Sequence, residues 1–214
     1  MKKIILAAAA ALALSSTIMA STAASAATEG PELLKNKWTF DGATGKFDKL
    51  QLQRGLQVYR EVCSSCHSLK YIAFRNLTAL GYSEAQVKAL ASEYEYPAID
   101  DEGSDIKRKG TPADHFPNPY PNEKFARASN NGALPPDLSL MTKAREGGPN
   151  YVYSLMQGYE EPPPGFDLLA GMNYNKYFPG HQIGMSQQII DDKVTYADGT
   201  KATAQQISAD ISAF

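Results

Sequence analysis

The chain has 214 residues, with 21 basic and 23 acidic residues and a formal net charge of −2. This balance gives no support for nucleic-acid binding, which needs a basic surface. Two cysteines are too few for the disulfide framework of a small secreted scaffold. The length is enough for one domain with its own hydrophobic core.

The first 26 residues have the features of a secretory signal peptide. Lys2 and Lys3 precede an apolar run from Ile4 to Leu14, and Ala24 to Ala26 form a small-x-small cleavage site. The apolar run is too short to span a membrane. We therefore predict a signal peptide at residues 1–26, export of the protein, and a mature domain at residues 27–214 with 19 basic against 23 acidic residues.

The mature chain begins with an irregular segment, residues 27–47, whose Trp38 and Phe40 are expected to cover part of the core. A helix is predicted to begin at Asp48, because apolar residues then recur at helical spacing. These residues are Leu52, Leu56, Tyr59 and Val62. Gly55, in the middle of this helix, predicts that another helix crosses closely there.

Directly after this helix comes the most informative motif of the chain, Cys63-Ser64-Ser65-Cys66-His67. Two cysteines three positions apart, followed at once by histidine, are the attachment signature of a c-type haem. The thiols add to the haem vinyl groups, and the histidine becomes the proximal iron ligand. Tyr59, one turn earlier, is expected to pack near the haem.

Two other interpretations of the motif are weaker. A structural zinc site needs four ligands, and the remaining histidines, His115 and His181, lie far away in the sequence. A thioredoxin-like dithiol would follow a hydrophobic strand, whereas the residues before Cys63 have a helical pattern.

Further helices are predicted along the rest of the chain. Ser83 and Gln86 form a capping box for a helix that extends to Tyr94. Shorter helices are expected at residues 123–128, 138–145 and 151–156, with Asp137 and Asn150 as N-caps of the last two. A final helix begins at Thr203, and residues 194–200 could form a small hairpin.

Residues 97–122 contain five prolines, which predicts irregular structure. Four acidic residues lie close together in this segment: Asp100, Asp101, Glu102 and Asp105. The cluster is either a docking surface for a basic protein or a solvated loop.

A sixth ligand to the iron is not identified by local chemistry alone. Methionine in that position raises the reduction potential, and the mature chain contains Met141, Met156, Met172 and Met185. The first two fall on predicted helices, where core packing is the usual role. Met172 and Met185 lie in loops, and His181 competes with both.

Several segments resemble one family. They are residues 38–74, the run NNGALPPDLS at 130–139 and the run YFPGHQIGM at 177–185, with 110–128 and 144–148 in addition. All are similar to bacterial cytochrome c1, the haem subunit of the ubiquinol–cytochrome c oxidoreductase (cytochrome bc1) complex. The resemblance implies a mainly α fold: a single c-type cytochrome domain with long irregular loops and at most a small β-hairpin.

The resemblance also implies a cofactor and its site. One haem c would be attached through two thioether bonds to Cys63 and Cys66, with His67 and Met185 as iron ligands. Arg145 and Tyr151 would lie near a haem propionate, and Pro136, with its neighbour Pro135, would line the haem face. This chain has Ser186-Gln187-Gln188 where many family members have prolines.

The function implied is electron transfer, without bond chemistry by this subunit. It would accept electrons from the Rieske iron–sulfur subunit, beside cytochrome b in the same quinol-oxidising respiratory complex, and pass them to a soluble cytochrome c. The expected location is the periplasmic side of the bacterial inner membrane. Family members continue into a C-terminal membrane anchor, and this chain ends at Phe214, so we interpret it as truncated.

Two other function classes stay open, namely a haem enzyme such as a peroxidase and a haem-based sensor. Both would require an open or labile sixth position on the iron.

Overall fold

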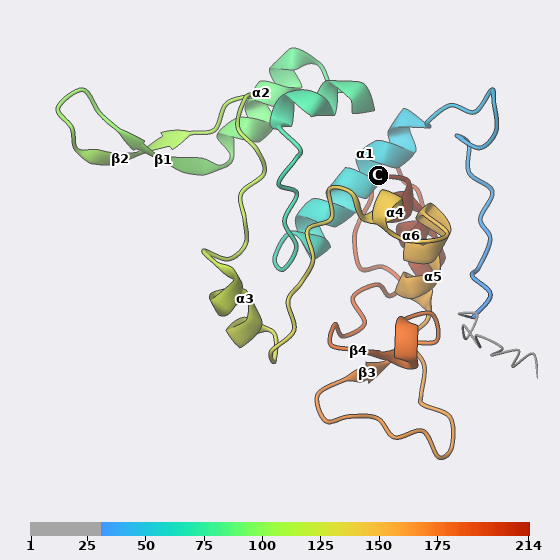
Figure 1. Ribbon diagram of the computed structural model, residues 1–214. Coiled ribbons are helices and arrows are strands. Elements are labelled where there is room, and N and C mark those ends of the chain that lie inside the picture. The colour runs from blue at the N-terminus through green and yellow to red at the C-terminus, as the bar shows by residue number, and fades with distance from the viewer. Residues whose placement is uncertain (1–30) are drawn as a thin grey trace, which may run out of the picture.

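The computed structural model describes residues 31–214. The predicted signal peptide at residues 1–26 therefore lies outside the described residues. The fold is mainly helical, as predicted (Figure 1). The helices are α1 (Lys49–Val58), α2 (Glu84–Ser92), α3 (Glu123–Ser129), α4 (Met141–Ala144), α5 (Pro149–Gln157) and α6 (Ala204–Ala213), with a π-helical turn at Tyr59–Cys63 and 3₁₀ helices at Phe74–Leu80 and Pro179–His181.

Helix α1 begins where its sequence predicts. The Asp48 side chain accepts hydrogen bonds from the backbone N–H groups of Leu50 and Gln51, and so caps the helix. The four residues predicted at helical spacing are all buried. The last turn widens into a π-turn, in which Ser64 N–H donates to the Tyr59 carbonyl over 2.8 Å. The motif cysteines therefore follow a helix anchored in the core.

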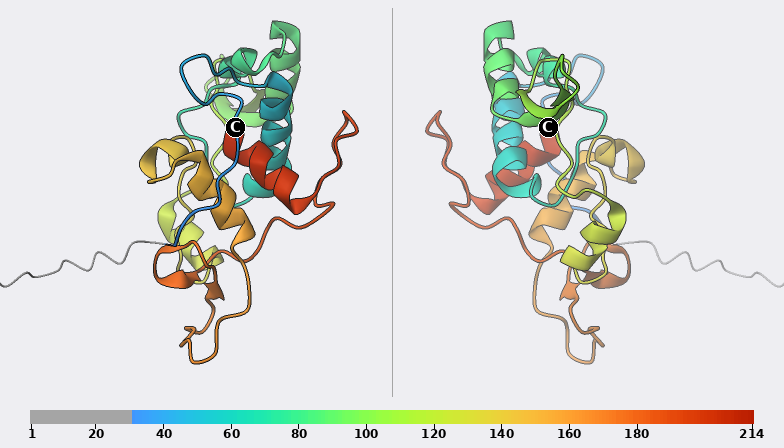
Figure 2. Two further views of the ribbon diagram at one scale, coloured as in Figure 1. Left: turned by 90° about the vertical axis from the view of Figure 1, so that its right-hand side faces the viewer. Right: turned by 90° about the vertical axis from the view of Figure 1, so that its left-hand side faces the viewer.

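Helices α1 and α6 cross in close contact at Gly55, as predicted. A Cβ atom added at Gly55 would overlap the Asp210 carbonyl and the Cβ of Phe214. Figure 2 shows α6 lying across α1, with α5 beside it. Glycine is thus required here because the two backbones leave no room for a side chain.

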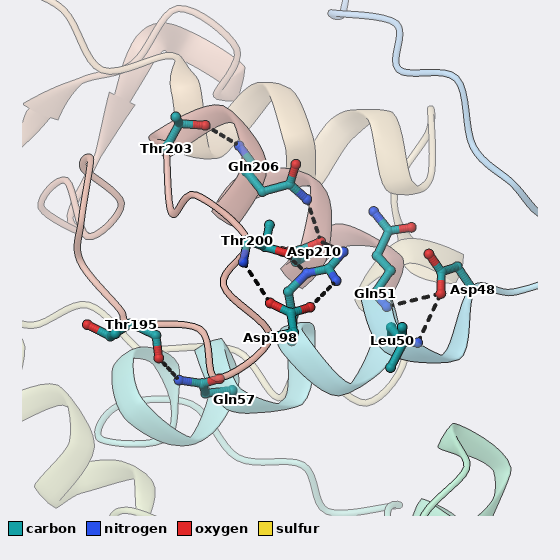
Figure 3. A network of polar contacts seen from close by, with 11 residues as sticks. Asp48, Leu50, Gln51, Gln57, Thr195, Asp198, Thr200, Thr203, Gln206 and Asp210 are labelled. Carbon is teal, nitrogen blue, oxygen red and sulfur yellow. Dashed lines mark hydrogen bonds and ion pairs between the residues drawn. The ribbon is translucent and has the colours of Figure 1, made fainter.

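A buried ion pair joins the same two helices. The carboxylate of Asp210, fully buried, accepts from Arg54 Nε at 3.0 Å and from Gln206 Nε2 at 2.9 Å. Arg54 also pairs with Asp198 at 2.8 Å, and Figure 3 shows Asp198 and Asp210 meeting at this crossing. Burial of a carboxylate requires such partners, so these contacts fix the register of α6 on α1.

Three clusters of buried side chains form the core. The largest surrounds Leu56, Tyr59 and Phe74 beneath α2, and the second joins Val58 to Ile189 and Ile207. Each fully buried aliphatic or aromatic side chain stabilises the fold by about 1.5–3 kcal/mol. The third cluster contains Trp38, which is buried as expected for the irregular lead-in.

The prediction of irregular structure over residues 97–122 is wrong for its first part. Strands β1 (Glu95–Ile99) and β2 (Asp105–Lys109) pair antiparallel as a hairpin that extends away from the helices (Figure 1). Pro97 belongs to β1, where it is tolerated because a strand of a two-stranded sheet has one unpaired edge. The four acidic residues lie at the turn of this hairpin and at its return into β2.

The hairpin predicted at residues 194–200 does not form. That segment is a turn around Gly199, whose N–H donates to the Tyr196 carbonyl. A second small sheet lies elsewhere, between β3 (Asn173–Tyr174) and β4 (Gln182–Ile183). Val194 and Tyr196 pack into the second core cluster, and this packing, rather than strand pairing, accounts for apolar residues at these positions.

The remaining helix starts are partly as predicted. Ser83 and Gln86 form the predicted capping box of α2, and Thr203 caps α6. The predicted caps Asp137 and Asn150 are wrong, because α4 and α5 start at Met141 and Pro149. The Asn150 side chain accepts hydrogen bonds from Asn36 and Trp38 instead, so it ties the lead-in to α5.

Candidate functional site

The two cysteines are free thiols at the end of the π-turn. The N–H groups of Cys66 and His67 both donate to the Cys63 carbonyl, at 3.1 and 2.9 Å. Cys63 packs between the first two core clusters, and burial raises the pKa of its thiol to about 12. The motif is therefore a tight turn in which the Cys63 thiol stays protonated.

The His67 imidazole is oriented by a backbone carbonyl. Its Nδ1 lies 2.8 Å from the Pro136 oxygen, so Nδ1 carries the proton and donates it to that carbonyl. Burial lowers the pKa of His67, so the ring is neutral. Nε2 then has a free lone pair, which is how a metal-binding histidine is prepared by its outer partner.

Tyr59 supports the same residue. Its hydroxyl donates to the His67 carbonyl over 3.0 Å, and its ring is fully buried. The backbone and the ring of His67 are thus both held by defined contacts.

Asp137 connects the run 130–139 to the chain just after His67. Its carboxylate accepts from the Ser68 hydroxyl at 2.7 Å, from Lys70 N–H at 2.8 Å and from Ser139 N–H at 3.0 Å. Sequence analysis assigned it as a helix cap and so missed this role. The sequence shows only that Asp137 follows Pro136, and this position does not predict hydrogen bonds to residues near His67.

Met185 lies just after β4, and Met172 lies just before β3. Both side chains are half-buried. A Cβ atom added at Gly184 would lie 4.0 Å from the Met172 sulfur and 3.0 Å from the Cβ of Ala133. The β3–β4 pair therefore brings both candidate sulfur ligands to the same part of the molecule, against the 130–139 run.

Four residues of that run connect the two halves of the candidate site. Pro136 contacts His67 at one end, and Ala133 packs against Gly184 at the other. The step from residue 133 to residue 136 spans at most about 11 Å. These contacts place residues 133–136 between His67 and the loop that contains Met185.

The other residues implied by the resemblance have distinct environments. Tyr151 is buried. Arg145 and Pro136 are exposed. His181 donates through Nδ1 to the Lys176 carbonyl and stacks on Tyr174, so its contacts are those of a loop residue.

The residues present fit a c-type haem. Two free thiols, a neutral histidine with Nε2 available and methionines in nearby loops are the donors that such a group needs. Among the described residues, no group of three or more His, Cys, Asp or Glu side chains comes together, as a structural zinc site requires.

Comparison with known proteins agrees with this donor set. The model of the cytochrome C1 family matches residues 38–214. The chain belongs to the cytochrome c1 family. This is a family of c-type haem proteins of respiratory electron transport, and the predicted resemblance is confirmed.

Individual relatives cover most of the chain. Cytochrome c1 of Rhodospirillum rubrum is 49% identical over 209 residues, which cover 90% of this chain and 77% of that protein. The mitochondrial cytochrome c1 haem protein of Kluyveromyces lactis is 51% identical, over 83% of this chain and 61% of its own length. Cytochrome b/c1 of Bradyrhizobium diazoefficiens is 51% identical over 84% of this chain, which spans only 29% of that longer protein.

Helices long and apolar enough to cross a bilayer do not occur in residues 31–214.

Proposed function

We propose that this member of the cytochrome c1 family carries one haem c and transfers single electrons without bond chemistry of its own. Cys63 and Cys66 would form the two thioether bonds, His67 would be the proximal ligand and Met185 the distal ligand. The observation that supports this most is the four-residue connection from the His67–Pro136 contact to the Met185 loop. The haem, when bound, supplies the one-electron redox chemistry.

The residues of this chain have separable tasks in that role. Pro136 fixes the tautomer of His67, and the buried Tyr59 holds its backbone. A thioether from Met185 would favour the ferrous state and raise the potential. The hydroxyl of the buried Tyr151 would donate to a propionate, and Arg145 would pair with that propionate through its planar fork.

The partners proposed follow from the family. One relative is named as the catalytic subunit of a cytochrome b-c1 complex in Candida albicans. We propose that this chain works beside cytochrome b and a Rieske iron–sulfur subunit, which is its electron donor, and that a soluble cytochrome c is the acceptor. The predicted signal peptide supports a place on the periplasmic side of a bacterial inner membrane.

Two measurements test the haem assignment. Mass spectrometry of the mature protein should show one haem added, and Cys63→Ser with Cys66→Ser should lose it. Haem that leaves the wild-type protein in acidified organic solvent would contradict covalent attachment.

Absorption spectroscopy tests the ligand assignment. The wild type should be six-coordinate and low-spin, with the weak near-infrared band of sulfur ligation. Met185→Leu keeps a similar volume but removes the sulfur, so it should lose the band, lower the potential and bind carbon monoxide. Met172→Leu is the matched control, and loss of the band in this variant alone would show that Met172 is the ligand. A high-spin wild type would favour a haem enzyme or sensor.

A further inference from the structure

A phenol two residues after the end of α5 contacts the backbone of the loop that contains Met185. The Tyr159 hydroxyl donates to the Met185 carbonyl over 3.0 Å, and Tyr159 is half-buried. This contact joins residues 26 positions apart, and no local sequence pattern predicts it.

The segment that precedes Met185 is anchored by the buried side chain of Asn175. Asn175 is fully buried, and its Nδ2 donates to the Leu155 carbonyl in α5 over 2.8 Å. Its Oδ1 accepts from Tyr177 N–H at 3.0 Å, and its own N–H donates to the His181 carbonyl. The bond to Leu155 ties this segment to the C-terminal end of α5, and the other two hold the segment before Met185 in its own fold.

Gly158 makes this anchoring possible. A Cβ atom at this position would lie 2.5 Å from the Asn175 Oδ1 and 2.6 Å from the Tyr177 ring. The Gly158 carbonyl also accepts from Lys176 N–H at 2.8 Å, and Tyr159 forms an isolated antiparallel bridge with Asn175. Tyr159 therefore leaves the helix from a fixed point.

The far end of the loop lacks comparable support. Ser186 and Gln187 are exposed, and the recorded side-chain contacts of Gln187 and Gln188 are to Ile189 and to Ser186. Among the described residues, the Tyr159 hydroxyl is the side chain that holds the Met185 backbone from the body of the domain.

We infer that Tyr159 is the positioning residue for Met185, holding its backbone so that the sulfur stays on the iron. This inference rests on the proposed function, because it assumes Met185 as the distal ligand. The iron–sulfur bond of a methionine ligand is weak, so the loop exchanges between a position in which the sulfur is bound and one in which it has left the iron. A hydrogen bond at the Met185 carbonyl shifts this equilibrium toward the bound position.

The test uses the haem-loaded protein and the Tyr159→Phe variant, which keeps the ring and removes only the hydroxyl. Loss of one hydrogen bond changes an equilibrium by about five- to tenfold. We expect azide or imidazole to bind the ferric iron about five- to tenfold more tightly in this variant. The near-infrared sulfur band should weaken accordingly at a given ligand concentration.

Tyr153→Phe is the matched control. Tyr153 lies on α5, and its hydroxyl accepts from Gln205 Nε2 over 3.0 Å, away from the Met185 loop. It should leave azide binding unchanged even if it lowers the melting temperature. Equal azide affinity in wild type and Tyr159→Phe, or an equal increase in both phenylalanine variants, would overturn the positioning role.

Met185→Leu separates this inference from the proposed function. If it abolishes the sulfur band while Tyr159→Phe behaves as wild type, the ligand assignment stands and the positioning role is refuted. If Met185→Leu keeps the band, the ligand assignment fails, and the positioning role fails with it.

Discussion

The Nδ1 atom of His67 lies 2.8 Å from the carbonyl oxygen of Pro136, 69 residues further along the chain. The carbonyl belongs to the backbone, so its place depends on what holds the 130–139 run. Asp137, the next residue, does this through three accepted hydrogen bonds, two of them from Ser68 and Lys70 just after His67.

Asp137→Ala should therefore raise the reduction potential of the haem-loaded protein. Without the carboxylate, the Pro136 carbonyl is held less firmly at Nδ1, and a histidine that loses its outer acceptor is a weaker donor to the metal. Three donors also lose their partner, at about 0.5–1.5 kcal/mol each. Potentiometric titration and urea unfolding measure the two effects.

Two further variants separate the effect on the potential from a general loss of stability. Asp137→Asn keeps one acceptor oxygen and should restore part of the wild-type potential. Ser92→Ala removes a hydroxyl that donates to the Ala89 carbonyl on α2 and should leave the potential unchanged. An Asp137→Ala protein that is less stable but has the wild-type potential would show that the contact is structural only.

Gly55→Ala should destabilise the domain. In an open helix this change stabilises by about 1 kcal/mol, but here the new Cβ meets the Asp210 carbonyl and Phe214. Overpacking of this kind costs about 1–3 kcal/mol. Lys88→Ala, exposed on α2, is the control and should unfold like the wild type. A higher urea midpoint for Gly55→Ala would contradict the close crossing.

The stability of the hairpin base should depend on pH through Asp114. Its carboxylate accepts from both Arg108 Nη atoms, at 2.7 and 2.6 Å, and from Thr111, and these bonds hold its pKa well below the usual 3.8. A depressed folded pKa stabilises the fold above about pH 4, and this contribution is lost as the pH falls through the folded value.

Asp114→Asn removes that contribution. The wild type should have the higher urea midpoint at pH 7, and the difference should shrink as the pH falls below about 4. Asp101→Asn, at the hairpin turn, controls for the loss of one negative charge. A difference between wild type and Asp114→Asn that stays constant from pH 7 to pH 2 would rule out this linkage.

The acidic turn of the β1–β2 hairpin is predicted to steer a basic cytochrome c. Asp101, Glu102 and Asp105 are exposed on a hairpin that extends away from the helices. Charges of this kind act on the association rate and are screened beyond about 10 Å at 0.1 M salt. Reversing these three residues to lysine should slow electron transfer at low salt and leave the haem spectrum unchanged.

Asp100 is left intact in that variant, because its carboxylate accepts from the backbone of Glu102 and Ser104 and so shapes the turn. The comparison is the double reversal of the exposed Glu160 and Glu161, which follow Tyr159. Equal rates for wild type and the triple reversal at low ionic strength would show a solvated turn, and slowing by the double reversal alone would place docking beside the Met185 loop.

Short-range patterns in the sequence were sufficient for the features that depend on neighbouring residues. The Cys63–His67 motif, the Asp48 and Ser83 caps and the helical spacing of Leu52 to Val62 all act within one or two turns, so they could be predicted without knowing the fold. The close contact at Gly55 is long-range but was also predicted correctly, because a glycine inside a helix has few explanations other than close packing.

Only the tertiary structure decided the features that depend on residues far apart in the chain. Prolines and charges concealed the β1–β2 hairpin, because strand pairing depends on a partner rather than on local propensity. Asp137 has the form of a helix cap but binds Ser68 and Lys70, and Tyr159 reaches the carbonyl of Met185 across 26 residues. Such contacts form only when the core brings distant segments together, so the spacing of residues in the sequence cannot predict them.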